Sequence, residues 1–300
     1  MSLRRLGLAT FCAALLIGCS LLGVAYKQAD RWLLHEADDY LDLSDDQREP
    51  LRAVLRQRLE VHRTRELAGY VDFLDRAHAA AGDGLDAAEV DSLATQLQGL
   101  VQTTLAGTLP AIAGVLAALE PGQVAHLQAR LEADDQRFRK RSVVATVQRR
   151  ADRQTKTTVG AIEHWTGDLS TAQRERVAKR VRAWPPVAAD WHAYRVARTA
   201  GLIELLRGSA EPSTVERYLA SRWVAHDGRS AALESGVAGL RRGILDLIVE
   251  VDGSLTGVQR TALLRRIRRY RDEFAALVPS PSPSPAMAEV GAVEAVGAID

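Results

Sequence analysis

The chain contains very little sulfur and few aromatic side chains. Its 300 residues include two cysteines, two methionines and 5 % aromatic residues. Both cysteines, Cys12 and Cys19, lie within the first twenty residues. The rest of the chain therefore has no thiol, which excludes disulfides, thiolate metal sites and cysteine nucleophiles there. The folded part must depend on a packed core for its stability.

A strong charge of one sign is also missing. The net charge is +1, with 26 % of the residues charged and 47 % apolar. This is ordinary globular composition, and a nearly neutral chain has no general attraction for nucleic acid, so we expect no nucleic-acid partner. The basic residues nonetheless gather in two short stretches, at 137–150 and 265–271. We interpret them as solvated helix faces that pair within the chain, and the alternative is a charged surface for a partner.

Spacings typical of metal and catalytic sites are absent as well. The seven histidines never pair three or four residues apart. The stretch "HEADD" from His35 has Asp39 where a zinc-binding helix needs its second histidine. The sequence has no phosphate-binding P-loop, no EF-hand calcium loop and no G-x-S-x-G turn. We therefore expect no metal, no cofactor and no enzymatic activity.

The start of the chain has the features of a bacterial lipoprotein signal. An arginine pair precedes an uncharged apolar run at 6–17, which is too short to span a bilayer as a helix. The run ends in "LIGC", which resembles the lipobox at which lipoproteins are cleaved and lipidated. We expect residues 1–18 to be a signal peptide, Cys19 to carry the lipid anchor, and 19–30 to be a tether. Ser20 follows that cysteine, and by resemblance to the sorting rule of enteric bacteria it favours the outer membrane, facing the periplasm.

One short phrase occurs four times at irregular intervals. The copies are "LSDDQREPLRAVL", "LEPGQVAHLQARL", "LSTAQRERVAKRV" and "LTGVQRTALLRRI", which begin at Leu43, Leu119, Leu169 and Leu255. Three copies place Gln three residues after Ser or Thr, which is the capping box that begins a helix. In the second copy Glu120 takes the hydroxyl position, and a weaker fifth copy has Asp86 and Glu89. The predicted helix-cap residues are Ser44, Gln47, Gln123, Ser170, Gln173, Thr256 and Gln259.

The apolar residues of these phrases fit helices that pack on a core. Seven and eleven residues after the cap every copy is apolar, and two such positions lie one turn apart on a single helix face. The irregular spacing of the copies argues against a solenoid, which needs a fixed period. Each phrase therefore predicts the start of one amphipathic helix.

No segment alternates apolar and polar residues over the length of a strand, so we predict an all-α fold without a sheet. The predicted architecture is a multi-helix bundle or an extended helical array over residues 31–278. Residues 279–300, rich in Ser, Pro and small residues, are a predicted disordered tail. The first long helix is expected over 47–80, where Pro50 should kink or delay it. The other helical patterns cover 86–107, 120–163, 170–183, 187–206, 213–225, 229–250 and 256–277.

An acidic stretch precedes the first capped helix. Asp38, Asp39 and Asp42 are interleaved with leucines, and helical spacing places carboxylates and leucines on different sides of one short helix. We interpret the carboxylates as partners of the arginines at 137–150 and 265–271, holding the N-terminal helix to the body. The alternative is a site for a cation or a basic partner beside the membrane. Under that alternative these three residues form the candidate partner surface.

Two resemblances extend this interpretation. The capping phrase resembles the L-[ST]-x-x-Q motif of the periplasmic Spy/CpxP-type helical proteins, which carry it twice and act as ATP-independent chaperones or as stress and metal sensors. The stretch "YKQADRWLLHEADDYLDLSDDQ", from Tyr26 to Gln47, resembles the leading signature of an uncharacterised family of proteobacterial outer-membrane lipoproteins. The segment with Pro185, Pro186 and Trp191 is similar to that family too. This second resemblance implies an all-helical fold and an outer-membrane location, but no activity.

Together these observations favour a non-enzymatic helical scaffold that binds proteins. It would be anchored to the membrane through lipid at Cys19 and hold unfolded or secreted clients on an amphipathic face, in the manner of a chaperone. One alternative is an envelope-assembly lipoprotein with a single fixed partner. Others are a stress or metal sensor like some Spy relatives, and a steric foldase that resembles the helical lipase chaperones in architecture alone.

Overall fold

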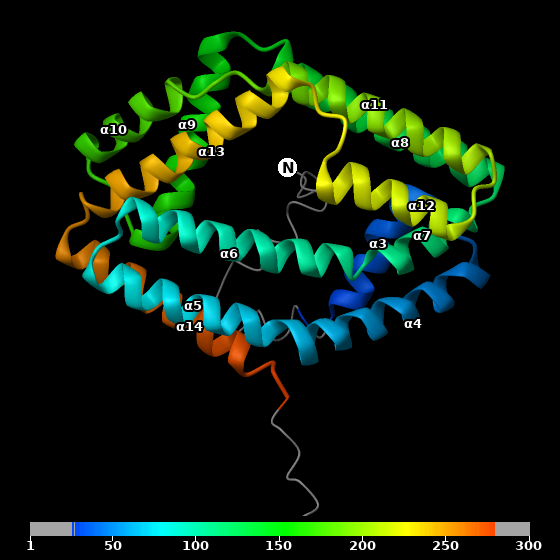
Figure 1. The fold of residues 1–300 in the computed structure, drawn as a ribbon, viewed down its shortest axis with the longest axis horizontal. Coiled ribbons are helices and arrows are strands. Elements are labelled where there is room, and N and C mark those ends of the chain that lie inside the picture. Colours follow the sequence, from blue (N-terminus) through cyan, green and yellow to red (C-terminus); the bar gives the residue numbers. More distant parts are fainter. Residues whose placement is uncertain (1–25, 27, 280–300) are drawn as a thin grey trace, which may run out of the picture.

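The computed structural model describes residue 26 and residues 28–279 (Figure 1). Every regular element in these residues is a helix, which confirms the all-α prediction. The first half contains α3 (Ala29–Leu41), α4 (Asp45–Val61), α5 (Leu67–Asp83), α6 (Ala87–Ala106), α7 (Leu109–Ala117) and α8 (Pro121–Phe138). The second half contains α9 (Val147–Thr166), α10 (Thr171–Arg182), α11 (Ala188–Arg207), α12 (Pro212–Leu219), α13 (Ala231–Asp252) and α14 (Gly257–Ala275). Short π-helical segments occur at η1 (His62–Glu66), η2 (Arg139–Val143) and η3 (Ala220–Ala225).

The two halves of the chain follow the same packing plan. In the first half α3 lies against α4 and α8, and in the second half α9 lies against α10 and α14. α5 packs on α14 of the second half, and α11 correspondingly packs on α8 of the first. α6 pairs with α13, and α12 with α7, in the same reciprocal way. The fold therefore has an approximate two-fold repeat.

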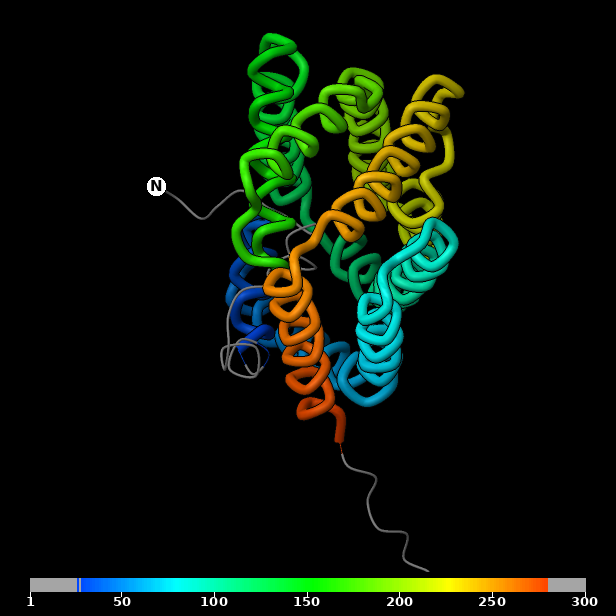
Figure 2. Tube along the Cα trace, turned by 90° about the vertical axis from the view of Figure 1, so that its left-hand side faces the viewer, coloured from blue at the N-terminus to red at the C-terminus, as the bar shows by residue number. Residues whose placement is uncertain are grey.

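Because of these exchanges the halves are interlocked rather than adjacent. The pair α5 and α14 lies at one edge of the molecule, and the pair α8 and α11 lies at the opposite edge (Figure 1). In the side view of Figure 2 the C-terminal helix, drawn orange to red, lies among the blue and cyan helices of the first half. Each half supplies helices to the core of the other, so the described residues form one domain.

The apolar positions of the repeated phrases lie in the core, as their spacing predicts. Leu43 and Leu169, which open two of the phrases, are each 4 % exposed. Leu127 and Val177, seven residues after their caps, are buried, and so is Val181, eleven after its cap. Fully burying one such side chain stabilises a fold by about 1.5–3 kcal/mol. Each phrase thus begins a helix and directs it into the core.

The predicted single helix over 120–163 is wrong, because the chain breaks in its middle. α8 ends at Phe138, a π-helical turn follows, and α9 begins only at Val147. Thr146 caps the new helix by accepting a hydrogen bond from the backbone N–H of Arg149 at 3.3 Å. Two valines and this threonine precede the new start, and β-branched residues lower helix propensity.

Pro50 does not delay the first capped helix, so that part of the prediction is wrong. α4 begins at Asp45 and continues to Val61 with Pro50 inside it. Because proline has no N–H, the hydrogen bond from position 50 to the carbonyl of Asp46 is absent, but the helix continues past it. The chain departs from α-helical geometry later, in η1, which begins at His62.

Candidate functional site

Several predicted features lie outside the described residues. They are the signal peptide at 1–18, the lipidation residue Cys19 and nearly all of the tail at 279–300. Most of the tether at 19–30 is outside as well, although Tyr26 and residues 28–30 are described. The predicted cap residues and the three candidate aspartates all lie within the described part.

The four glutamines of the repeated phrases form two reciprocal pairs, which we call the glutamine clasps. Gln47 and Gln123 donate hydrogen bonds to each other's side-chain oxygen, at 3.1 and 2.7 Å. Gln173 and Gln259 do the same, at 3.0 Å in both directions. The partners are 76 and 86 residues apart in the chain. Each clasp therefore joins the starts of two helices that are distant in sequence.

Each clasp glutamine also closes the cap of its own helix. In all four phrases the glutamine side-chain oxygen accepts the backbone N–H of the cap residue, at 2.9–3.0 Å. Three of the glutamines donate a further hydrogen bond to the carbonyl two residues before the partner's cap: Gln123 to Asp42, Gln173 to Ser254 and Gln259 to Asp168. One amide thus serves polar groups at two helix starts, which only a side chain with both a donor and an acceptor can do.

Two of the candidate aspartates pair with arginines that lie close by. Asp38 accepts the backbone N–H of Leu43 at 3.0 Å and forms an ion pair with Arg48 at 3.3 Å. Asp39 forms an ion pair with Arg130 at 3.7 Å. These side chains are each about one third exposed, so each pair is screened by solvent and contributes little by itself.

The predicted partners of these carboxylates, at 137–150 and 265–271, are therefore wrong. α3 turns back onto α4 after three residues and also packs on α8, so Arg48 of α4 and Arg130 of α8 are the arginines that reach the acidic helix. Asp42 has a role through its backbone: it ends α3 in the left-handed conformation, with φ 50°, and its carbonyl accepts the bond from Gln123. Its own side chain is exposed.

The buried acid of this region is Asp30. Its carboxylate accepts hydrogen bonds from Arg52 at 3.1 Å and from Arg56 at 3.0 Å. Burial alone would raise the pKa of Asp30, but the hydrogen bonds from the two arginines outweigh it and hold the pKa below its ordinary value. Asp30 therefore remains charged, and its two hydrogen bonds hold the start of α3 against α4.

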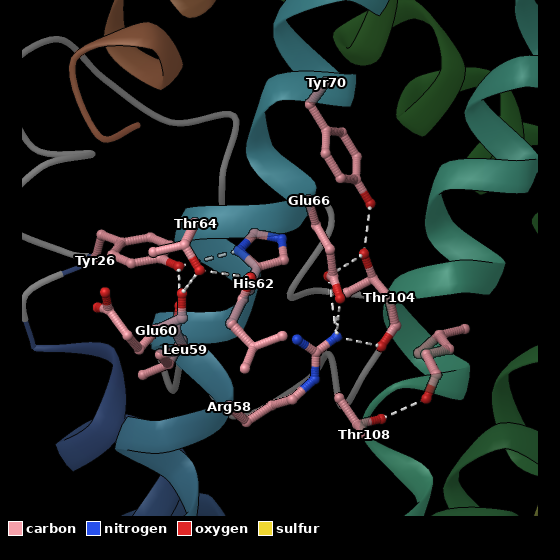
Figure 3. A network of polar contacts seen from close by, with 12 residues as sticks. Tyr26, Arg58, Leu59, Glu60, His62, Thr64, Glu66, Tyr70, Thr104 and Thr108 are labelled. Atoms are coloured by element: carbon pink, nitrogen blue, oxygen red, sulfur yellow. Dashed lines mark hydrogen bonds and ion pairs between the residues drawn. The ribbon is translucent and has the colours of Figure 1, made fainter. Parts of the chain in front are cut away.

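A second polar network lies where η1 meets the end of α6 (Figure 3). Arg58 donates to both carboxylate oxygens of Glu66, at 2.7 and 2.9 Å, and to the carbonyl of Thr104 at 2.9 Å. The Thr104 hydroxyl donates to Glu66 at 2.9 Å and lies 3.1 Å from the hydroxyl of Tyr70. The Arg58 and Glu66 side chains are 14 % and 13 % exposed, so this is a largely buried ion pair. It fixes the C-terminal end of α6 to the bend between α4 and α5.

On the other side of η1 a buried histidine contacts the N-terminal segment (Figure 3). The Tyr26 hydroxyl donates to the carbonyl of Leu59 at 2.8 Å and lies 3.0 Å from Nδ1 of His62. Burial raises the pKa of Tyr26 to about 12 and lowers the pKa of His62. Both groups are therefore neutral near pH 7. This contact attaches the segment that leads in from residue 19 to the helical body.

The N-terminal end of α6 is held by another buried carboxylate. Asp252, 4 % exposed, accepts the backbone N–H of Leu85 at 2.8 Å and forms an ion pair with Arg260. Arg260 also donates to the carbonyl of Ala81 at 2.8 Å. Charged networks therefore fix both ends of α6.

From Ser92 onward, α6 and the following α7 carry no ionisable side chain. The uncharged stretch runs from Ser92 to Leu119. By length and composition, residues Ala87–Ala117 could cross a membrane, but in the structure a turn at 107–108 divides them into two helices. Only 17 % of the most apolar part of this segment is buried inside the fold. The buried residues of α7, Leu109, Ala113 and Leu116, join the main core, and the rest of the segment is largely uncovered. It presents an uncharged surface of partly apolar character.

The uncharged surface is extended by the helix beside it. α13 packs along α6, where Arg241 donates to Asp91 at 2.6 Å and to Thr95 at 3.2 Å. Large apolar side chains remain exposed on all three helices. They are Leu97 on α6, Ile112 on α7, and Ile244 and Ile248 on α13. We call the exposed residues of α6 and α7 within 92–117, with these two isoleucines, the α6 surface.

Comparison with known proteins places the chain in a family. The model of a family of unknown function, DUF6279, matches residues 39–224, which is more than half of the chain. The chain belongs to DUF6279. The match includes three of the four repeated phrases, the polar network of Arg58, Glu66 and Thr104, and the whole of α6 and α7. It ends before α13 and α14. This agrees with the expected resemblance to an uncharacterised family. No curated protein and no solved structure matches this DUF6279 chain.

Sequence reasoning missed the residues that hold α6 in place. Arg58, Glu66 and Thr104 belong to three different elements, and Asp252 and Arg260 come from the other half of the chain. Only the absence of charge between residues 92 and 119 was visible in the sequence of this DUF6279 member. Within the described residues no group of three or more His, Cys, Asp or Glu side chains is placed to hold a metal ion.

Proposed function

We propose that this DUF6279 chain is a lipid-anchored, periplasm-facing lipoprotein that acts without catalysis as a helical scaffold for protein clients. The observation that carries the proposal is the α6 surface. Monomeric soluble proteins rarely leave contiguous apolar surface exposed unless it serves binding. Here an uncharged stretch runs through α6 and α7, buried ion pairs hold both ends of α6, and only 17 % of the most apolar part of the segment is buried.

The chemistry of the α6 surface suits extended or unfolded client segments. Thr95, Gln98, Gln102 and Thr103 are exposed beside Leu97, so hydrogen-bonding groups alternate with apolar contact area. Such a surface can accept the backbone groups and the apolar side chains of a client at the same time. The absence of charge gives it no preference for clients of one sign.

The membrane anchor follows from the sequence pattern at Cys19 and from the position of Tyr26. Tyr26 is fixed to Leu59 and His62 on the helical body. Seven residues span at most about 25 Å when fully extended. A lipid at Cys19 would therefore keep the η1 end of the domain within that distance of the membrane surface, in reach of clients that cross or leave the envelope.

An aggregation assay tests the proposal. The purified chain is added to a reduced, permanently unfolded client protein, and light scattering is followed with time. We expect near-stoichiometric suppression, which Leu97→Lys and Ile248→Lys should weaken because they place charge on the α6 surface. Val258→Lys is the matched control, since Val258 is 82 % exposed but lies on α14. No suppression by the unchanged chain, or equal loss in all three variants, would contradict a client site on α6.

A further inference from the structure

Many partly buried arginines in this fold pair with carboxylates, and others, such as Arg150 and Arg266, donate to a backbone carbonyl or to a histidine. Arg52 pairs with Asp30. Arg195 donates from Nε to Asp135 at 2.9 Å, and its Nη2 lies 2.8 Å from the same carboxylate oxygen. Two arginines beside η3 differ from this pattern. Arg198 of α11 and Arg229, just before α13, form no salt bridge with any residue that the structure describes, although neither is fully exposed.

These two guanidinium groups share the same aromatic rings instead. The Arg198 Cζ lies 5.6 Å from the ring centre of Trp191 and 5.5 Å from that of Tyr194. The Arg229 Cζ lies 5.3 and 5.9 Å from the same two rings. Arg198 also lies 4.6 Å from the ring of Trp223. A guanidinium that stacks on a ring keeps the N–H edge in its own plane available for an acceptor.

Three nitrogens of this cluster are buried without a hydrogen-bond partner in the described chain. They are Nε of Arg198, Nε of Arg229 and Nδ1 of His226. A buried donor or acceptor left unsatisfied costs about 1–3 kcal/mol, so such groups are ordinarily paired. All three side chains lie around the Trp191 ring, since the His226 ring centre is 6.1 Å from it and both guanidinium groups stack on it. We therefore expect an acceptor beside this ring.

The surroundings of the cluster favour an anion. The His226 ring lies beside the Trp191 ring that both guanidinium groups share. Burial lowers the pKa of His226, and the charges of Arg229 and Arg198 lower it further. Burial also lowers the pKa of Arg198. The carboxylate that acts on Arg198 is Asp135, which is already held by Arg195. Two positive charges are therefore left without a counter-charge in a nearly neutral protein.

We propose that Arg198, Arg229 and His226 form a binding site for a phosphate-type oxyanion, either free in solution or carried by a lipid headgroup. Two guanidinium groups can each donate two parallel hydrogen bonds to such an anion, and two positive charges match its double negative charge. The imidazole completes the set from the third side. Trp191, Tyr194 and Trp223 hold the guanidinium groups in orientation.

Calorimetric titration of the purified full chain with inorganic phosphate, at low salt and without other oxyanions, tests the site. We expect binding by the unchanged chain and at least about tenfold weaker binding by Arg198→Gln and by Arg229→Gln, because hydrogen bonds to charged groups are lost. His226→Asn tests the imidazole while keeping a residue that tolerates the left-handed backbone found at φ 60°. Arg241→Gln is the control, because Arg241 is already paired with Asp91.

A second experiment identifies the source of the anion and distinguishes loss of the site from misfolding of a variant. Sedimentation with phosphatidylglycerol vesicles is compared with free phosphate. Binding to vesicles alone, lost in Arg198→Gln and Arg229→Gln, assigns the site to a headgroup, and binding to free phosphate assigns it to a soluble anion. In either case the preferred ligand should raise the Tm of the unchanged chain but not of these variants. Binding to neither probe, or equal losses in the Arg241→Gln control, would overturn the proposal.

Discussion

Gln173 and Gln259, 86 residues apart in the chain, donate hydrogen bonds to each other's side-chain oxygen at 3.0 Å. Both side chains are buried, and both also close the caps of their own helices. Gln47 and Gln123, which belong to the other two repeated phrases, form the same reciprocal pair of hydrogen bonds. One short phrase therefore specifies where a helix starts and which other helix start it meets.

The clasp predicts a coupled loss of stability. Gln173→Ala removes a cap bond, takes the clasp partner from Gln259 and removes the donor to the carbonyl of Ser254, so we expect a loss of about 1–3 kcal/mol in urea unfolding. Glu89→Ala is the control, because Glu89 closes the cap of an exposed helix start and should cost about 0.5–1 kcal/mol. The double variant Gln173→Ala with Gln259→Ala should lose less than the sum of the two single changes. Strict additivity would mean that the two glutamines do not act together.

The starts of the capped helices were predictable because a capping box is local. Ser170 and Gln173 are three residues apart, and their bond depends on little beyond that spacing. The pairing of Gln173 with Gln259 was not predictable, since it depends on how the two halves interlock. α7 was missed for a related reason: Gly107 and Pro110 are breaker residues in the sequence, yet Pro110 lies in the first turn, where its missing N–H is tolerated.

The acidic stretch shows a second limit. Ion pairing of Asp38 was expected from the charge balance, but the partner was sought in distant basic clusters. The structure gives Arg48, ten residues away, because α3 and α4 form a tight hairpin. Charge composition indicates that pairs form, whereas chain geometry decides which ones.

This hairpin gives a prediction for Asp38 and Asp39. Asp38→Ala removes the acceptor of the Leu43 backbone N–H and the Arg48 ion pair, so it should cost about 1 kcal/mol. Asp39→Ala removes only the longer, partly exposed pair with Arg130 and should cost less than about 0.5 kcal/mol. Thermal melting in the absence of any partner measures both. Equal or negligible effects, together with the loss of a co-purifying protein, would make the acidic stretch a partner surface instead.

The largely buried pair of Arg58 and Glu66 predicts a larger effect. Glu66→Gln leaves a buried guanidinium without its counter-charge, and breaking a buried pair in this way typically costs about 3–5 kcal/mol. Changing both residues together, Arg58→Met with Glu66→Leu, should recover much of that loss because no unpaired charge remains. Chemical denaturation of the three chains measures this. A double variant as unstable as Glu66→Gln would show that the cost has another origin.

The buried histidine predicts a pH dependence of stability. Because burial lowers the pKa of His62 in the folded state, the unfolded chain binds the proton more tightly, at an ordinary value of about 6.5. The contribution of neutral His62 is therefore complete above pH 6.5 and is lost as the pH falls below it. His62→Gln should reduce the drop in Tm between pH 7.5 and 5. His164 and His226, whose pKa values are lowered as well, should keep part of the drop. An unchanged pH profile in His62→Gln would contradict this assignment.

The predicted anchor has its own test. Cys19→Ser should abolish incorporation of labelled palmitate and release the chain from the membrane fraction, because the acylated residue is removed. Cys12→Ser, seven residues earlier, is the control and should leave labelling unchanged. Labelled palmitate on the Cys19→Ser chain would contradict the lipoprotein prediction.

The central claim is that clients bind on the α6 surface, and photo-cross-linking in intact cells tests it most directly. A photoreactive residue is placed at Leu97 in one chain and at Val258 in a second, two exposed apolar positions on different helices. The account predicts adducts with several envelope or secreted proteins from position 97 and few or none from position 258. Adducts of equal yield from both positions, or none from position 97, would contradict it.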